Sequence, residues 1–337
     1  MRLDFSLFKY VLITTCLLYG CEKALIEEDP INTPVENFDI FWEELDRHYP
    51  FFELKQIDWD SVYALHRPSI SNNTTPIDLF QTLESISLSL RDAHVNLYTP
   101  LGDVEYDFKA GFPVNSNIHA FNYTINRTQA SRVVAYGDII NSNLGYITIS
   151  SFGGERDDYR VIDDILELFK EKDGIIIDVR SNGGGSSLNS DIIATRFADE
   201  ERLYRHIRYR NGPEQSDFSR WFDDSVKPRG SSQYTSPVVI LTNRGCFSTT
   251  EDFILAMRTM PHVTIMGDTT GGGSGNPILR ELPNGWAFRI STWMVVSPEF
   301  VAYEGIGIPP DTTIWINPND STAGRDTILE GAINLLN

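Results

Sequence analysis

One serine of this chain stands where its hydroxyl group could act as a nucleophile. Ser248 follows an apolar stretch at 237–241 that predicts a β-strand, and it precedes an apolar helical pattern at 253–257. A serine in the first turn of a helix lies at the positive end of the helix dipole, among backbone N–H groups without a partner inside the helix. Such groups can stabilise the oxyanion that forms when a serine attacks a carbonyl carbon. The position therefore favours Ser248 as a catalytic nucleophile.

The same residues also fit a purely structural role. Ser248 and Glu251 have the spacing of a capping box, in which a serine and a glutamate three residues later satisfy each other's backbone donors. Local sequence alone favours this capping role, because the pattern is common in front of apolar helices. The decision between the two roles depends on the rest of the chain.

A set of short motifs follows in a fixed order along the sequence. They read DWD at 58–60, LRDAHV at 90–95, GYITISSF at 145–152, IDVRSNGGG at 177–185, NRGCFS at 243–248, GDTTGG at 267–272 and GIGIPPD at 305–311. Each is weak by itself, but the ordered set resembles the tail-specific and tricorn-type serine peptidases. This family includes the carboxyl-terminal processing peptidases, and its core also occurs in interphotoreceptor retinoid-binding protein. The resemblance implies an α/β, crotonase-like (ClpP/crotonase) layered core with an N-terminal helical bundle.

The resemblance offers two catalytic designs, which differ in the base. Processing peptidases pair the serine with a lysine at the end of a glycine-rich loop, a position that falls near Gly273 here. No lysine follows Lys227, so this chain cannot build that dyad. The tricorn-type design uses a histidine in front of the core, and His94 matches it. A histidine suits the task because its ordinary pKa lies near neutral pH, although a histidine here could also simply cap helix carbonyl groups.

The tricorn-type design also implies a glutamate that orients the base through a neighbouring serine. Glu304 matches the glutamate, but Ala93 stands where the serine precedes the histidine. We therefore expect either Asp92 or a direct contact between Glu304 and His94 to replace the missing hydroxyl group. The alternative for Glu304 is an exposed loop carboxylate without a catalytic role.

Two backbone N–H groups are expected to form the oxyanion hole. One belongs to Thr249, and the other to the glycine run at 183–185, with Gly184 the favoured donor because a residue without a side chain lets the backbone approach a substrate. The run lacks the Lys-Ser/Thr ending of a phosphate-binding loop, which argues against nucleotide binding. Asp178 and Arg180 are expected to support the loop rather than react. No cofactor and no metal site are expected, because the histidines and cysteines are scattered.

These residues need elements to position them. Apolar periodicity predicts an N-terminal helical bundle at 35–95, followed by an α/β core at 96–337. About fifty residues separate His94 from Gly145, too few for a full peptide-binding PDZ domain. Strands are predicted at 112–114, 120–125, 132–136, 146–150, 174–179, 237–241, 263–267 and 286–295, and helices at 159–170, 186–198, 249–259 and 329–336.

The N-terminus resembles a bacterial lipoprotein signal. Arg2 and Lys9 precede a short apolar run, and a glycine precedes Cys21. The resemblance implies a signal peptide at 1–20, lipidation of Cys21, a tether at 21–34 and a location in the bacterial cell envelope, in the periplasm or at the cell surface. A plain secretory signal is the alternative. Within the globular part only Cys246 remains, so no internal disulfide is expected.

The composition limits the choice of partners. The 337 residues are 41% hydrophobic, typical of a globular protein, and the formal net charge of −19 disfavours nucleic acid. We predict an exported, lipid-anchored serine peptidase that hydrolyses peptide bonds through Ser248, His94 and Glu304. The main alternative is a catalytically weak or inactive module that binds a peptide or hydrophobic ligand on the same fold, and a non-peptide hydrolase is a third. Whether the chain forms a homo-oligomer stays open.

Overall fold

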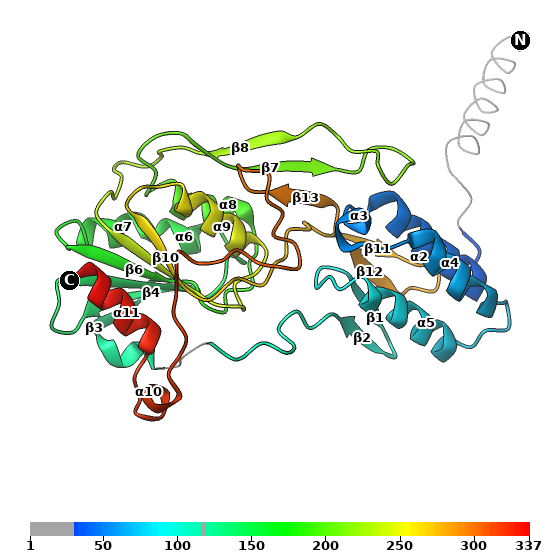
Figure 1. The fold of residues 1–337 in the computed structure, drawn as a ribbon, viewed down its shortest axis with the longest axis horizontal. Helices are drawn as coiled ribbons and strands as arrows, with labels where there is room; N and C mark the ends of the chain where they lie inside the picture. The colour runs from blue at the N-terminus through cyan, green and yellow to red at the C-terminus, as the bar shows by residue number, and fades with distance from the viewer. Residues whose placement is uncertain (1–29, 116–118) are drawn as a thin grey trace, which may run out of the picture.

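The computed structural model describes residues 30–115 and 119–337. Figure 1 shows two units side by side: a helical unit that contains the first described residues, and a larger α/β unit that contains the C-terminus. The predicted signal peptide, Cys21 and most of the predicted tether lie outside the described residues. Within the described part, no helix has both the length and the apolar character needed to cross a membrane.

Short polar caps start the helices of the N-terminal unit. Thr33 begins α2 by accepting a hydrogen bond from the N–H of Glu36 at 3.1 Å, and Thr75 begins α5 in the same way, with proline at the first helical position. Asp58 caps α4 through the N–H of Ser61. The helices of this unit are α2 (Pro34–His48), α3 (Phe52–Lys55), α4 (Trp59–His66), the 3₁₀ turn η1 (Arg67–Ser69) and α5 (Pro76–Ser89).

A small antiparallel sheet completes this unit and changes its predicted boundary. Its order is β11 (Ile278–Glu281), β12 (Ala287–Ile290), β1 (Asn96–Thr99) and β2 (Gly102–Glu105). Apolar side chains of the sheet, among them Leu97 and Phe288, share one buried cluster with Phe41 and Leu83 of the helices. These four strands lie within 96–337, the range that we assigned to the α/β core. In the structure they instead bury their apolar face against the N-terminal helices.

A second, seven-stranded sheet forms the centre of the α/β unit. Its order is β14 (Thr312–Thr313), β10 (Val263–Gly267), β9 (Val238–Thr242), β6 (Gly174–Asp178), β5 (Leu144–Ile149), β4 (Val134–Ile139) and β3 (Thr124–Gln129). The first five strands are parallel, and β4 and β3 are antiparallel. Because β6, β9 and β10 are parallel neighbours, the loops that follow them meet at one edge of the sheet.

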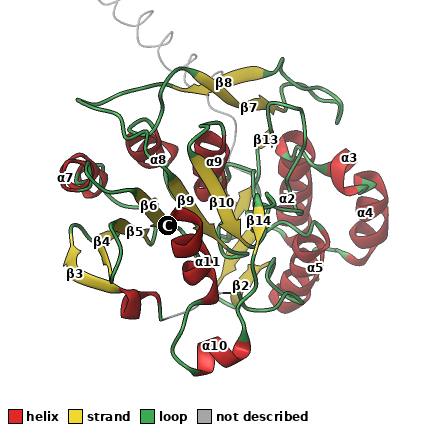
Figure 2. Ribbon diagram, turned by 60° about the vertical axis from the view of Figure 1, so that its left-hand side comes forward, coloured by secondary structure: helices red, strands yellow, loops and turns green. Residues whose placement is uncertain are grey.

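Both faces of this sheet are buried, as the continuous apolar strands predict. Ile175, Ile177 and Ile240 pack into one cluster with α7 (Ile162–Leu168), α8 (Ser187–Ala194) and α9 (Thr249–Arg258), whereas Ile176 and Val239 pack on the other face against α11 (Thr327–Leu336). Figure 2 shows α8 and α9 on one side of the strands and α11 on the other. The alternation follows from the two-residue period of a strand.

A third sheet, which the sequence did not predict, lies beside α9. It contains β13 (Trp293–Val296), β7 (Arg202–Tyr209) and β8 (Phe222–Val226). The single strand predicted at 286–295 is therefore wrong: it divides into β12 and β13, which belong to different sheets. The division falls at Thr292 and Trp293, whose N–H groups both donate to the carbonyl oxygen of Gly275 instead of continuing a ladder.

Three other predictions need correction. Residues 112–114 form no strand, and 120–125 begin as the 3₁₀ turn η2 (Ala120–Tyr123) before β3. The helix predicted at 159–170 is two short helices, α6 (Asp157–Arg160) and α7, which are joined at Val161. The remaining helix is α10 (Pro318–Thr322).

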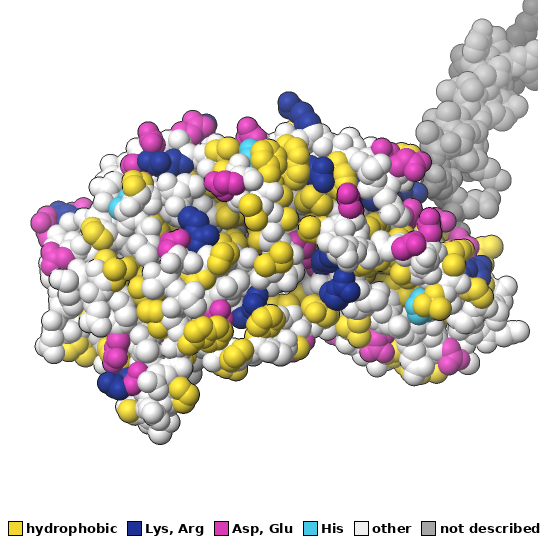
Figure 3. All heavy atoms as spheres, in the orientation of Figure 1, with side chains coloured by type: hydrophobic (Ala, Val, Ile, Leu, Met, Phe, Trp, Pro, Cys, Tyr) yellow, Lys and Arg dark blue, Asp and Glu magenta, His cyan; other side chains and the backbone are white. Residues whose placement is uncertain are grey.

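On the face drawn in Figure 3, acidic side chains are spread over both units and basic side chains form no continuous patch.

Candidate active site

Ser248 lies in the turn between β9 and α9, with a backbone conformation that residues with side chains rarely adopt. Its φ is 58° and its ψ is −128°. Such a conformation costs about 1–3 kcal/mol and persists only where surrounding contacts impose it. Asn243 supplies some of these contacts, because its side-chain oxygen accepts hydrogen bonds from the N–H groups of Gly245 and Ser181 at 3.0 and 2.8 Å. The half-buried Ser248 is thus held at the start of α9, as predicted.

Glu251 ties this turn to the neighbouring glycine loop. Its carboxylate accepts the N–H of Ser248 at 3.0 Å, as a capping box requires, and also the N–H groups of Gly272 and Gly273 at 2.7 Å each. The hydroxyl group of Thr270 lies 2.5 Å from the same carboxylate. Burial raises the pKa of Glu251 to about 8, while these hydrogen bonds act in the opposite direction. The capping role and a catalytic role of Ser248 are therefore compatible, since the cap orients the turn.

His94 lies in the turn between α5 and β1 and lines the same cavity as Ser248. The cavity has a volume of about 440 Å³ and lies between the two units. The imidazole ring packs on Phe247, with ring centroids 4.7 Å apart, and its Nδ1 is buried without a hydrogen-bond partner. Burial lowers the pKa of His94 to about 4. The ring is therefore neutral near pH 7, the form that can accept a proton.

Asp92 fixes the turn that carries His94. Its carboxylate accepts the backbone N–H of His94 at 2.8 Å and the hydroxyl group of Ser291 at 2.8 Å. Burial opposes ionisation of Asp92, but Lys55 and His94 bring its pKa below the ordinary value. Asp92 thus orients the backbone of the histidine, and it makes no hydrogen bond with the imidazole ring.

Glu304 is buried, not exposed, but no hydrogen bond joins it to His94. One carboxylate oxygen accepts the N–H and the hydroxyl group of Ser274 at 2.8 and 3.0 Å, and the other accepts the ammonium group of Lys55 at 2.9 Å. The direct contact between Glu304 and His94 that the sequence suggested is therefore absent from this structure. Ser274 and His94 line the same cavity, so Glu304 is connected to the cavity wall through a serine from the glycine-rich loop.

Lys55 is the residue that sequence reasoning missed. It comes from α3, and its ammonium group lies 2.9 Å from Glu304 and 3.7 Å from Asp92. Burial disfavours its charge, yet the two carboxylates raise its pKa above the ordinary value. The family's lysine base stands after Ser248, where this chain has no lysine, so the family resemblance did not point to Lys55. The local sequence contained one indication that Lys55 is buried: it follows shortly after the aromatic residues Tyr49, Phe51 and Phe52, which are buried.

The backbone donors near Ser248 differ in part from the prediction. The N–H of Thr249 has no hydrogen-bond acceptor among the described residues, so it is available to an oxyanion. Gly184 needs correction, because its buried N–H donates to the side chain of Asn182 at 2.9 Å. Its neighbours Gly183 and Gly185 are exposed and line the cavity. Gly184 instead allows close packing, since a Cβ there would lie 2.9 Å from both Ser248 Cβ and the Thr249 nitrogen.

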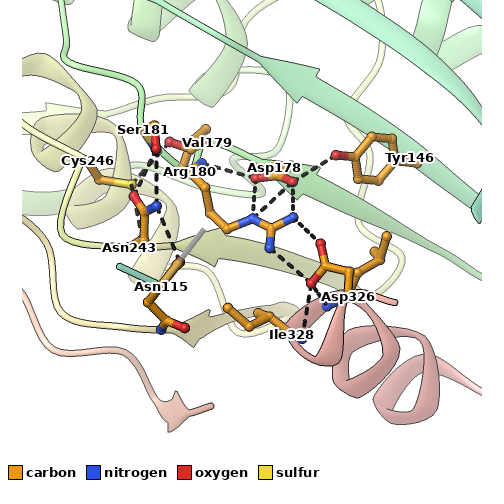
Figure 4. A network of polar contacts seen from close by, with 11 residues as sticks. Asn115, Tyr146, Asp178, Val179, Arg180, Ser181, Asn243, Cys246, Asp326 and Ile328 are labelled. Carbon is orange, nitrogen blue, oxygen red and sulfur yellow. Dashed lines mark hydrogen bonds and ion pairs between the residues drawn. The ribbon is translucent and has the colours of Figure 1, made fainter. Parts of the chain in front are cut away.

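Asp178 and Arg180 belong to a network of ion pairs at the end of β6. The Arg180 guanidinium lies between Asp178 at the end of β6 and Asp326 at the start of α11, with N–O distances of 2.5 and 2.8 Å (Figure 4). Tyr146 adds a hydrogen bond of 2.7 Å to Asp178. This network fixes the end of the strand that leads into the glycine run, and the predicted supporting role is confirmed. Within the described ranges, no group of three or more His, Cys, Asp and Glu residues could hold a metal ion.

The arrangement defines a class of protein: a serine at a strand–helix turn, a neutral histidine in the same cavity, and beside the serine the N–H of Thr249, which has no acceptor among the described residues. The pattern of peptidase family S41 matches residues 143–314, and that of the tricorn protease C1 domain matches residues 32–86. The chain therefore belongs to peptidase family S41.

Individual relatives agree with this assignment. A crystal structure of a candidate peptidase from Parabacteroides merdae ATCC 43184 superposes with a TM-score of 0.83 and 36% identity, and covers 91% of this chain and 97% of the other. The carboxy-terminal processing protease CtpA of Bacillus subtilis (strain 168) is 24% identical over 175 residues, or 51% of this chain and 35% of the relative. The tricorn protease of Thermoplasma acidophilum is 26% identical over 204 residues, or 57% of this chain and 16% of that protein. The chain spans less than half the length of the curated relatives CtpA and tricorn protease.

Proposed function

We propose that this protein is a serine peptidase that hydrolyses peptide bonds with Ser248 as nucleophile and His94 as base. The observation that carries the proposal is the shared cavity, which is lined by Ser248, by His94 with its neutral ring, and by Thr249, whose N–H has no acceptor among the described residues. The parallel sheet with helices on both faces also agrees with a crotonase-like layered core.

The proposed reaction follows from these positions. His94 removes the proton from the Ser248 hydroxyl group, and the oxygen attacks the carbonyl carbon of the scissile peptide bond. The N–H of Thr249, together with an N–H of Gly183 or Gly185, binds the resulting oxyanion. His94 then protonates the leaving amine, and a water molecule that His94 deprotonates releases the acyl group from Ser248.

Glu304 takes part in this proposal as a positioning residue. It anchors Ser274 at the cavity wall beside the base and is itself held by Lys55. Ser274, rather than the position of Ala93, is proposed to supply the hydroxyl group that would connect Glu304 with the base; in the structure Ser274 bonds to Glu304, and Nδ1 of His94 has no hydrogen-bond partner among the described residues. The structure contains no hydrogen bond between the Ser248 hydroxyl group and His94, and such bonds often form only when substrate is bound.

The proposal is tested by digestion of a peptide mixture. Protein lacking residues 1–21 is incubated with randomised peptides, and new termini are identified by mass spectrometry. The parent should generate new termini, and Ser248→Ala should reduce the rate by at least about 1,000-fold. Equal rates for parent and variant would contradict the mechanism.

Export and lipid anchoring belong to the proposal as well. The support is the N-terminal sequence, in which an apolar run ends at Gly20 and Cys21. Expression of the full chain in a bacterium should yield a membrane-associated protein whose first residue is a lipidated Cys21, detected by mass spectrometry of the N-terminal peptide. Cys21→Ser should release the protein from the membrane fraction, and a variant that stays membrane-bound would contradict the anchor.

A second candidate function is peptide or hydrophobic-ligand binding without turnover. The observation in its favour is that Ala93 replaces the serine and that Glu304 pairs with Lys55 instead of contacting His94. Peptides that bind parent and Ser248→Ala equally well, with no new termini in either sample, would favour this alternative.

A further inference from the structure

Two arginines line the catalytic cavity, and they differ in their partners. Arg205 forms ion pairs with Asp224, at 2.8 Å, and with Asp252. Arg289 has no carboxylate within ion-pair distance among the described residues, and its one hydrogen bond goes to the side-chain oxygen of Asn96 at 3.3 Å. Arg205 is therefore neutralised by the protein itself, whereas the positive charge of Arg289 is left for another group.

The backbone of Arg289 is fixed by the sheet, and Asn96 orients its side chain. It lies on β12 between β11 and β1, opposite Leu279, and its strand neighbours Phe288 and Ile290 are buried in the core of the N-terminal unit. The half-buried Arg289 side chain therefore projects to the opposite face of the sheet, where the cavity lies. Asn96 is itself buried and donates to the carbonyl oxygen of Ala93 at 3.2 Å. One asparagine thus links the arginine to the turn that carries His94.

An unpaired arginine in this cavity is unexpected from the charge balance of the chain. The sequence contains 47 acidic and 28 basic residues, so carboxylates outnumber bases. The charge of Arg289 is also close enough to the His94 ring to contribute to lowering its pKa, next to the larger effect of burial. Arg289 and His94 line the same cavity, so a substrate that occupies the cavity beside the base lies within reach of the guanidinium group.

We propose that Arg289 binds a carboxylate group of the peptide substrate inside the catalytic cavity. The inference rests on the proposed function and adds the class of substrate to it. A guanidinium group binds a carboxylate through two parallel N–H···O hydrogen bonds, and a site shielded from water strengthens them. The carboxylate is either the free C-terminus of the substrate or an acidic side chain.

Glu105 limits where this carboxylate can lie. Glu105 lies on β2, lines the same cavity and is the cross-strand neighbour of Asn96 on β1. Because Asn96 also bonds to Arg289 on β12, Glu105, Asn96 and Arg289 form a row across three strands, with Glu105 and Arg289 at its ends. Glu105 has no ion-pair partner among the described residues, and its negative charge repels a second carboxylate. The substrate carboxylate therefore has its favourable position at Arg289, at the opposite end of the row.

The test measures binding, so that it does not depend on turnover. Immobilised Ser248→Ala protein is incubated with equal amounts of two pools of randomised N-acetylated peptides, one with free C-termini and one with C-terminal amides. Retained peptides are quantified by mass spectrometry. We expect at least about tenfold enrichment of peptides that carry a carboxylate, the factor that corresponds to 1.4 kcal/mol. Enrichment of the free-acid pool assigns the C-terminus, and enrichment of Asp and Glu within the amide pool assigns a side chain.

Three further variants make the test specific. In the Ser248→Ala background, Arg289→Gln should abolish the enrichment, and Arg289→Lys should keep part of it, because the charge remains but the paired hydrogen bonds do not. Arg220→Gln removes an exposed arginine outside the cavity and should leave the enrichment unchanged. Unfolding in urea verifies that each variant is folded.

The failing outcomes are distinct. Absence of enrichment for carboxylates in either pool, or enrichment that survives Arg289→Gln, would overturn the assignment of Arg289. Peptide hydrolysis by the parent without carboxylate preference would remove this inference alone. Enrichment that depends on Arg289 in a protein without hydrolytic activity would instead remove the proposed peptidase function and leave the carboxylate site in place.

Discussion

The ammonium group of Lys55 lies 2.9 Å from the carboxylate of Glu304, although the two residues are 249 positions apart. Lys55 belongs to the N-terminal helical unit, and Glu304 belongs to the segment between β13 and β14 at the cavity. Both side chains are nearly inaccessible to water, at 7% and 2%. This ion pair connects the two units directly behind the candidate active site.

We expect Lys55→Met to be strongly destabilising. It leaves Glu304 and Asp92 buried without a counter-charge, and loss of one partner of a buried pair costs about 3–5 kcal/mol. The free energy of unfolding in urea measures the effect. Lys170→Met is the matched control, because Lys170 pairs with Glu167 on the surface, where 57% and 68% of the side chains are exposed and the pair is screened by solvent, so its loss should barely change stability. Equal losses in both variants would contradict a buried role for Lys55.

The pH dependence of peptide hydrolysis should follow the buried histidine. The neutral ring accepts the Ser248 proton, and burial lowers the pKa of His94 to about 4. Activity is therefore retained from pH 7 down to about pH 5 and is lost as the pH falls through about 4, where the ring becomes protonated. The measurement is kcat/KM against pH, and a loss near the ordinary value of 6.5 would contradict a buried, neutral base.

Glu304 could produce an acidic loss of its own, because burial raises its pKa. Glu304→Gln removes this titration, and in that variant the loss near pH 4 should remain while the maximal rate falls. A profile that loses its acidic limb in Glu304→Gln would assign that limb to the carboxylate and not to His94.

Gly184→Ala should disturb the nucleophile without removing any catalytic group. A Cβ at this position would lie 2.7 Å from the Phe247 carbonyl oxygen and 2.9 Å from Ser248 Cβ, and the φ of +97° disfavours any side chain. We expect a loss of about 1–3 kcal/mol in unfolding free energy from the crowding. We also expect a fall in hydrolysis of about 100-fold, since a small displacement of a reacting group is enough.

Gly183→Ala provides the control for folding stability. A Cβ at Gly183 has no heavy atom within 4 Å, so its unfolding free energy should stay within about 0.5 kcal/mol of the parent. If Gly184→Ala were as stable as Gly183→Ala, the close packing of Gly184 against the nucleophile turn would be contradicted.

The parts of the site that local sequence encodes were predictable. Ser248 is defined by a strand, a turn and a helix that follow one another directly along the chain, and the capping glutamate follows three residues later. Asp178 and Arg180 were assigned correctly because they flank the end of a buried strand. His94 was placed only through the resemblance of ordered motifs, since no periodicity connects it with a serine 154 positions later.

The remaining parts depend on contacts between distant segments. Lys55 acquires its role only when the two units pack together, and the sequence around it shows an ordinary short helix. The choice among Gly183, Gly184 and Gly185 depends on the orientation of single peptide groups, which residue type does not encode. The sheet of β1, β2, β11 and β12 escaped prediction because each strand has four residues, too few to show alternation. In addition, the pair that joins its two halves, β1 with β12, connects segments almost 200 positions apart.

Covalent labelling of the serine tests the central claim most directly. Protein lacking residues 1–21 is treated with a fluorophosphonate probe, digested and mapped by mass spectrometry, alongside Ser248→Ala and His94→Ala. The account predicts a single adduct on Ser248 of the parent, no adduct in Ser248→Ala and strongly reduced labelling in His94→Ala. An adduct on a different residue, or a Ser248 adduct that forms equally fast without His94, would contradict a nucleophile activated by this histidine.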